Sequence, residues 1–181
     1  TDAGMTDRRL EQIIQSRGIV GVVLSPVMSN EASLALDWTW RGFAVAVIGN
    51  VTWTPELHHA GHHHYLGMRM ALGELAKLGC QRPAALIDAE TNERAKRAWE
   101  AAFLTHHPAR AKAASLARVF APGELERVPD WLRTTKPDAL IVSTIPLLES
   151  RGLRAAVRAL KLPLVTLYWD DNTPAGIGGV S

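Results

Sequence analysis

The chain has 181 residues, of which 47% are hydrophobic and 21% charged, a balance typical of a globular protein with a buried core. The net charge is only +2 at pH 7, the basic residues are scattered, and no Cys/His finger spacing occurs, which argues against a nucleic-acid-binding domain in this segment. No apolar run approaches the ~20 residues that cross a bilayer. The single cysteine, Cys80, excludes an internal disulfide and fits a reducing cytoplasm.

Apolar residues in the first part of the chain predict two helices and two strands. The helices are expected over residues 6–17 and, from a weaker pattern, over residues 30–37. The continuous β-branched runs at residues 19–24 and 43–48 are typical of strands buried on both faces of a parallel sheet.

A third helix is predicted over residues 63–78. Met68, Ala71, Leu72 and Leu75 follow the i, i+3, i+4, i+7 spacing of one buried helical face. Gly79 stands where a left-handed C-cap ends a helix.

The second half of the chain repeats this alternation. Strands are predicted over residues 84–87, 116–120, 139–142 and 164–168, and helices over residues 92–105, 124–134 and 153–160. Six strands alternating with helices indicate an α/β fold with parallel sheets.

Four segments, in the right order, resemble motifs of the ligand-binding region of bacterial transcription regulators of the lactose-repressor (LacI/GalR) family. They are residues 9–26, 43–50, 137–142 and 164–178, and the helix at residues 63–79 resembles the family helix that leads into the second lobe. The resemblance implies two Rossmann-like lobes with parallel sheets, of the periplasmic-binding-protein-like type I. We expect a partial N-terminal lobe over residues 1–82 and a C-terminal lobe over residues 83–181.

The resemblance also implies a function. Such a region binds a small effector, here expected to be a sugar or polyol, in the cleft between its lobes, and thereby changes the affinity of a homodimeric repressor for operator DNA. Against the family pattern, we expect the chain to be truncated at both ends and to lack the DNA-binding headpiece. No membrane partner and no cofactor is implied. Because Gly-x-Ser-x-Gly, P-loop and Gly-x-Gly-x-x-Gly motifs are missing, we do not expect an enzyme.

Candidate ligand-binding residues follow from a general rule. In open α/β sheets, ligands bind beyond the carboxyl ends of the strands. The rule selects Ser25, Asn50, Asp88, Thr144, Trp169 and Asp170. Asp170 could accept hydrogen bonds from ligand hydroxyls, as the family's effector-contacting Asp does, or could cap a turn. Trp169 could stack on a sugar face or belong to the core.

A candidate arginine comes from the resemblance. The family often places an effector-binding Arg four residues before an aromatic residue, and that position before Trp99 is occupied by Ala95. Arg94 and Arg97 flank it, and we choose Arg94, since an Arg fork suits a carboxylate, phosphate or diol. The alternative for either residue is a solvated helix face.

The histidine run at residues 58–64 has two interpretations. His58/His62 and His59/His63 have the i, i+4 spacing by which a helix grips zinc, but Gly61 weakens a helix and no carboxylate completes the motif. We interpret the run as a loop and helix entry without a physiological metal. His63 takes the place of a family Asp beside the cleft and is a candidate ligand contact. The rival functions are a periplasmic sugar-binding protein of a transporter and a metal-dependent enzyme that uses this run.

Overall fold

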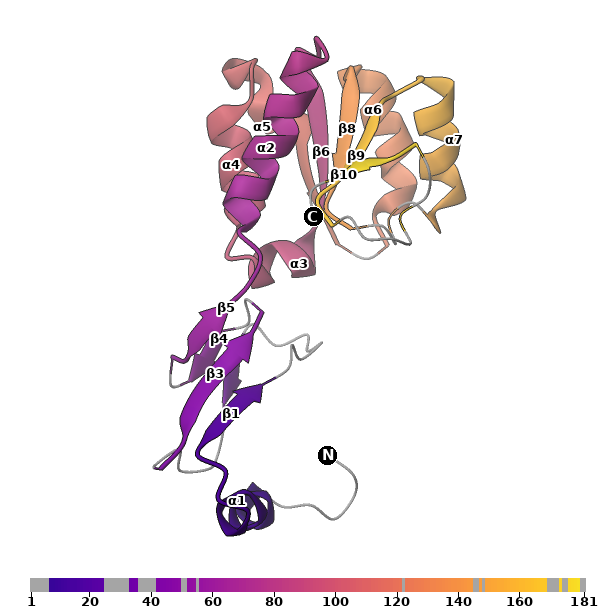
Figure 1. The fold of residues 1–181 in the computed structure, drawn as a ribbon. Helices are drawn as coiled ribbons and strands as arrows, with labels where there is room; N and C mark the ends of the chain where they lie inside the picture. Colours follow the sequence, from indigo (N-terminus) through magenta and orange to yellow (C-terminus); the bar gives the residue numbers. More distant parts are fainter. Residues whose placement is uncertain are drawn as a thin grey trace. The chain divides into compact units, whose positions relative to one another are not determined.

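The structure is a computed structural model that forms two compact units, residues Thr1–His62 (unit 1) and His63–Ser181 (unit 2) (Figure 1). It describes residues 7–24, 33–35, 42–49, 52–54, 56–121, 123–144, 147, 149–168, 173 and 176–179. The units divide earlier than the expected boundary at 82/83, because the helix that precedes that boundary packs against a helix of unit 2. The assignment of two lobes stays a prediction.

Unit 1 contains one described helix and two small parallel sheets. The helix is α1 (Asp7–Ser16). The larger sheet has the order β1-β3-β5, and β2 pairs with β4 in the smaller one. The strands are β1 (Gly21–Leu24), β2 (Ser33–Ala35), β3 (Ala44–Ile48), β4 (Thr52–Thr54) and β5 (His58–Ala60). The helix expected over residues 30–37 is wrong, because Ser33–Ala35 pairs in register with Thr52–Thr54.

The strands of unit 1 are not buried on both faces, which corrects the expectation from their apolar sequences. Val23 of β1 is 66% exposed and Ile48 of β3 is 51% exposed. Both lie on one sheet face, since Val23 is paired with Ala46 and side chains alternate along a strand. Among the described residues of unit 1, only Val47 is buried, and α1 is the one helix. A single helix cannot cover two faces of a sheet.

Unit 2 is built on a five-stranded parallel sheet with the order β10-β9-β8-β6-β7. The strands are β6 (Pro83–Asp88), β7 (Ala117–Phe120), β8 (Ala139–Val142), β9 (Leu164–Thr166) and β10 (Gly178–Gly179). Strand β8 is buried along its whole length, and β6 up to its last residue. The expected α/β class with parallel sheets is confirmed.

Helices cover both faces of this sheet, with α2, α4 and α5 on one side and α6 and α7 on the other (Figure 1). The helical elements are α2 (His64–Lys77), α3 (Ala89–Arg94), α4 (Ala98–His106), η1 (Arg110–Lys112), α5 (Ala113–Leu116), η2 (Leu125–Arg127), α6 (Val128–Thr135) and α7 (Arg151–Ala159). Large side chains from them, such as Trp99, Phe103 and Leu153, are almost fully buried. Within the described part of the chain, no helix has the length and apolar character needed to span a membrane.

One expected helix, over residues 92–105, is divided into α3 and α4. Lys96 adopts φ +51°, and the N–H of Arg97 donates to the carbonyl of Asn92 at 2.7 Å. This left-handed ending is the Schellman arrangement that also ends α2, where Gly79 supplies the positive φ. Lysine in the glycine position is why the apolar pattern alone did not predict the break.

Candidate functional site

The order of the strands selects one place on unit 2. From β6 the chain forms β7 on one side and then β8 on the other, so the strand order reverses between β6 and β8. In open α/β sheets, ligands bind at the carboxyl ends of the two strands that flank such a reversal. Here Ser143 follows β8, and its Oγ accepts a hydrogen bond of 2.9 Å from the N–H of Asp88, the last residue of β6. This bond ties the two strand ends together.

Asp88 also organises the short helix that follows it. Its Oδ1 accepts hydrogen bonds from the N–H and the hydroxyl of Thr91, at 2.8 and 2.6 Å, and so caps α3. Arg94 donates to the Thr91 hydroxyl at 3.3 Å and forms an ion pair with Glu90 at 3.0 Å. The Arg94 side chain is 23% exposed, so its charge is held near the sheet edge and is compensated there. Asp88, Glu90 and Arg94 together carry a formal charge of about −1 at neutral pH.

Three rings from separate elements meet at the same edge. His64 begins α2, Trp99 lies on α4, and Tyr168 follows β9. The centroid of the Trp99 ring lies 4.6 Å from that of His64 and 5.6 Å from that of Tyr168, both in edge-to-face geometry. His64 and Trp99 are buried, whereas Tyr168 is 39% exposed and can contact a ligand.

The Tyr168 hydroxyl stays protonated at physiological pH. Burial raises the pKa of the phenol above its ordinary value, and the positive charge of Arg94 offsets part of this increase. The ring is therefore a neutral group with an apolar face and a polar tip.

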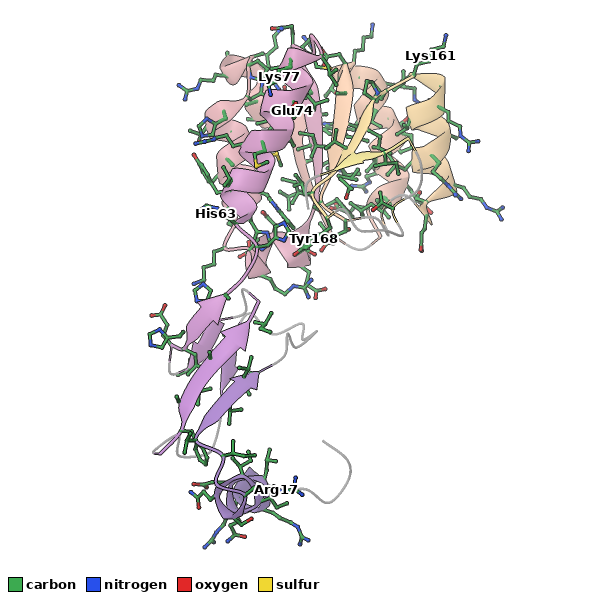
Figure 2. The ribbon with its side chains drawn as sticks, in the orientation of Figure 1. Arg17, His63, Glu74, Lys77, Lys161 and Tyr168 are labelled. Atoms are coloured by element: carbon green, nitrogen blue, oxygen red, sulfur yellow. The ribbon has the colours of Figure 1, made fainter. Side chains whose placement is uncertain are left out.

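The structure describes four of the eight candidate ligand-binding residues, and one of them, Asp88, is the residue that caps α3. Arg94 and Thr144 lie at the carboxyl edge of the unit 2 sheet, where Thr144 follows Ser143 and is half-buried. His63 is exposed and caps α2, with Nδ1 accepting from the N–H of Leu66 at 3.2 Å. Figure 2 shows His63 and Tyr168 at the same end of unit 2. The other four predicted residues, Ser25, Asn50, Trp169 and Asp170, lie outside the described residues.

Arg94 and Arg97 occupy different environments. Arg97 is 62% exposed and pairs with Glu100 at 2.9 Å. Its hydrogen bonds to Glu100 raise the pKa of its guanidinium. Ala95, at the position where the family places its Arg, is buried and has no polar atom to offer. Of the two candidate arginines, the geometry therefore favours Arg94, although its role stays a prediction.

The ring cluster was not predicted from the sequence. The carboxyl-end rule selected Trp169 and Asp170, whereas β9 ends at Thr166 and Tyr168 comes next but one. The hydroxyl of Thr166 accepts a hydrogen bond of 3.2 Å from the N–H of Tyr168 and ends the strand. A prediction that ended the strand at Thr166 would have selected Tyr168. His64 and Trp99 carry no such local signal, because they meet only through the packing of α2 on α4.

The histidine run does not form a helical metal site. His58 and His59 lie in β5, where successive side chains point to opposite faces, and α2 begins only at His64. The i, i+4 pairs therefore do not share a helix. Within the described ranges, no group of three His, Cys, Asp or Glu side chains is placed to hold a metal ion. The interpretation of the run as a loop and helix entry is corrected by the strand at His58–Ala60.

No protein-family model and no curated protein sequence matches the chain. Solved structures do match it. A PurR-family transcriptional regulator from Vibrio parahaemolyticus has a TM-score of 0.58 at 13% identity, covering 96% of this chain and 69% of that one. A sugar-binding transcriptional regulator of the LacI family from Escherichia coli, complexed with phosphate, has a TM-score of 0.57 at 16% identity, with 96% and 66% covered.

A LacI-family transcriptional regulator from Lactobacillus casei with bound glucose has a TM-score of 0.51 at 18% identity, and the match covers 96% of this chain and 70% of that one. The chain spans between 61% and 70% of the length of such structures. These likenesses concern the fold, and they agree with the resemblance found in the sequence. The chain has the periplasmic-binding-protein-like α/β fold of LacI-family transcriptional regulators.

Proposed function

We propose that this chain is the effector-binding region of a cytoplasmic transcriptional regulator that acts as a homodimer on operator DNA. The observation that carries the proposal is the group of Asp88, Ser143, Arg94 and Tyr168 at the strand-order reversal of unit 2, the place where open α/β sheets bind small ligands. The fold it shares with LacI-family regulators supports the regulatory role. A ligand that binds one conformation better than another would shift the population and so change DNA affinity.

The chemistry of the edge favours a neutral polyhydroxylated ligand. Tyr168 supplies a partly exposed aromatic face of the kind that packs against a sugar ring. Thr144 supplies a hydroxyl group and follows β8, the strand that pairs with β9. Arg94 is already paired with Glu90, so it can donate hydrogen bonds without attracting an anion strongly. The formal charge of about −1 from Asp88, Glu90 and Arg94 disfavours phosphate and carboxylate groups.

Ligand binding can be tested with matched pairs of compounds. Thermal unfolding of the chain would be measured with neutral monosaccharides and polyols, each beside its phosphorylated or carboxylated counterpart. We expect a neutral compound to raise the melting temperature and its anionic counterpart to have a smaller effect. Arg94→Gln should weaken this binding by about tenfold, or ~1.4 kcal/mol. Arg97→Gln, which removes the same positive charge on the other side of Ala95, should leave the binding affinity unchanged. Stabilisation by anions alone contradicts the proposal.

The regulatory role needs a separate test. The protein encoded by the full gene would be assayed for binding to DNA that lies upstream of that gene, with and without a stabilising neutral sugar. A change in DNA affinity on adding the sugar is the expected result. Sugar binding without any DNA binding contradicts the regulatory role and fits a transport receptor instead.

A further inference from the structure

Helix α7 carries a row of exposed cations. Arg151, Arg154 and Arg158 lie on the helix, Lys161 follows its last turn, and all four are exposed. At about 100° per residue, the three arginines fall within about 60° of one another around the helix axis. Figure 2 shows nitrogen-tipped side chains of α7 directed away from the sheet, with Lys161 beyond the end of the helix. We call this row the α7 stripe; it corrects the expectation that the basic residues are only scattered.

Ion pairs do not account for the α7 stripe. Among the described residues, none of its four cations belongs to an ion pair, whereas Lys77, Arg94, Arg97 and Arg133 each have a carboxylate partner. No acidic residue occurs within α7. The charges are therefore available to an outside partner.

Helix stability accounts for only part of the α7 stripe, because Arg158 in the last turn and Lys161 after it complement the negative end of the helix dipole, whereas Arg151 does not. Helices α3, α4 and α6 carry an acidic residue in the first turn, which complements the positive end of the helix dipole. Helix α7 has none there and begins with Arg151. A cation at that end opposes the dipole and costs about 0.3–1 kcal/mol. Only the position of Arg151 is therefore unfavourable for the helix.

The surface around the α7 stripe suits a phosphate backbone. Beside the cations lie the small residues Gly152, Ala155 and Ala159, which allow close approach, while Leu153 packs into the core. Protein interfaces use large apolar or aromatic anchors, and membrane-surface helices need an exposed apolar face. On α7 itself no aromatic residue occurs, and the exposed large apolar residue beside the stripe is Leu160, which is 36% exposed. Arg forks bind phosphate oxygens in two parallel hydrogen bonds, and no apolar contact is required.

We propose that the α7 stripe binds the phosphate backbone of double-stranded nucleic acid without reading its base sequence. From Arg151 to Arg158 the helix rises about 10.5 Å, a distance over which one DNA strand carries about three phosphates. The proposal concerns the outer face of unit 2 and does not depend on the proposed effector function.

The test compares two triple variants that lose the same charge. In Arg151→Gln/Arg154→Gln/Arg158→Gln the α7 stripe is removed, and in Arg8→Gln/Arg17→Gln/Lys112→Gln three other exposed cations are removed. Binding to a fluorescent DNA duplex of scrambled sequence is measured by anisotropy over a range of salt concentrations. We expect the α7 variant to bind at least tenfold more weakly, with a salt slope smaller by about 2.7. The control variant should stay close to the unchanged chain.

The following results would overturn the proposal. No duplex binding by the unchanged chain, or equal loss in both variants, shows that the α7 stripe is not a specific surface for nucleic acid. Parallel measurements use vesicles containing phosphatidylserine and a polyglutamate peptide. If either binds as tightly as the duplex and is lost in the α7 variant, the stripe belongs to a membrane or an acidic protein. Circular dichroism shows that each variant is folded; both sets of substitutions lie at exposed positions.

Discussion

The sheets of units 1 and 2 are built from similar apolar sequences and differ in burial. Strand β1, Gly-Val-Val-Leu, has no buried residue, whereas β8, Ala-Leu-Ile-Val, is buried throughout. The difference lies in what covers the strands. Helices pack on both faces of the unit 2 sheet, and α1 is the one helix among the described residues of unit 1. An apolar run therefore predicts a parallel strand, but its burial depends on covering layers elsewhere in the chain.

The largest expected effect compares one isoleucine in each sheet. Ile141 in β8 is 1% exposed and Ile48 in β3 is 51% exposed. Ile141→Ala should lower the free energy of unfolding by about 2–5 kcal/mol, since it removes buried methylene groups and leaves a cavity. Ile48→Ala should lower it by about 1 kcal/mol or less, because little surface returns to water. Urea titrations followed by circular dichroism measure both changes. Equal losses would mean that the exposed face of unit 1 is covered in solution.

A buried histidine gives the next largest effect and tests whether the interior of unit 2 depends on its polar groups. The Nδ1 of His107 accepts from the N–H of Ala109 at 2.9 Å, so Nε2 carries the proton and donates to the carbonyl of Pro83 at 2.9 Å. His107→Ala should cost about 2–4 kcal/mol, because both backbone groups lose their partner and a cavity forms.

The neighbouring His106 is the matched control for His107. It is exposed, and its Nε2 lies 2.9 Å from the Tyr65 hydroxyl. His106→Ala should cost about 0.5 kcal/mol or less, as exposed hydrogen bonds contribute little. If the two substitutions have the same effect on thermal unfolding, the contacts of His107 are not what supports the start of β6.

A smaller effect concerns Cys80, at the turn before β6. Burial, and next the negative charge of Asp138, raise the pKa of its thiol. The folded chain thus holds this proton more tightly than the unfolded chain does. Its contribution to stability is complete below the unfolded-state pKa of about 8.5 and is lost as the pH rises through the folded-state value. Unfolding measured across alkaline pH should show this fall, and Cys80→Ala should reduce it. A fall unchanged in the variant would assign it to other groups.

The smallest effect is expected at a surface ion pair of unit 2. Lys77 and Glu74 approach to 2.6 Å, but both side chains are about 70% exposed (72% and 69%). Glu74→Ala should change the free energy of unfolding by less than about 0.5 kcal/mol, and the small difference should vanish at high salt. A larger loss would show that the surface of unit 2, and not only its covered interior, distinguishes it from unit 1.

All the strands that were predicted from apolar runs are present in the structure. The strands that were not predicted contain no apolar run. Ser33–Ala35, Thr52–Thr54 and His58–Ala60 are strands because a neighbour pairs with them, which local composition does not reveal. Similarly, Lys96 and Lys161 end helices with positive φ in the position where glycine is expected. Tertiary pairing and unusual capping residues account for these errors.

The candidate site was predictable only where a local sequence signal points to its residues. Asp88 and Thr144 could be chosen because each ends or follows a strand closely in sequence, and the carboxyl-end rule needs only local information. Arg94 could be chosen only through the family resemblance, which pointed to the neighbouring position Ala95. The ring cluster joins His64, Trp99 and Tyr168, which come from distant parts of the chain. Such a contact exists only after α2 and α4 have packed on the sheet, so no local pattern could predict it.

The strand order of unit 2 has a consequence for how the protein is made. The first strand of this unit to leave the ribosome, β6, is also the one on which neighbours add at both edges. Strand β7 completes one side, and β8, β9 and β10 then extend the other side in the order of their synthesis. Each new strand thus finds its partner already present. We expect unit 2 to fold outward from β6 during translation, because each strand pairs with one that has already been synthesised.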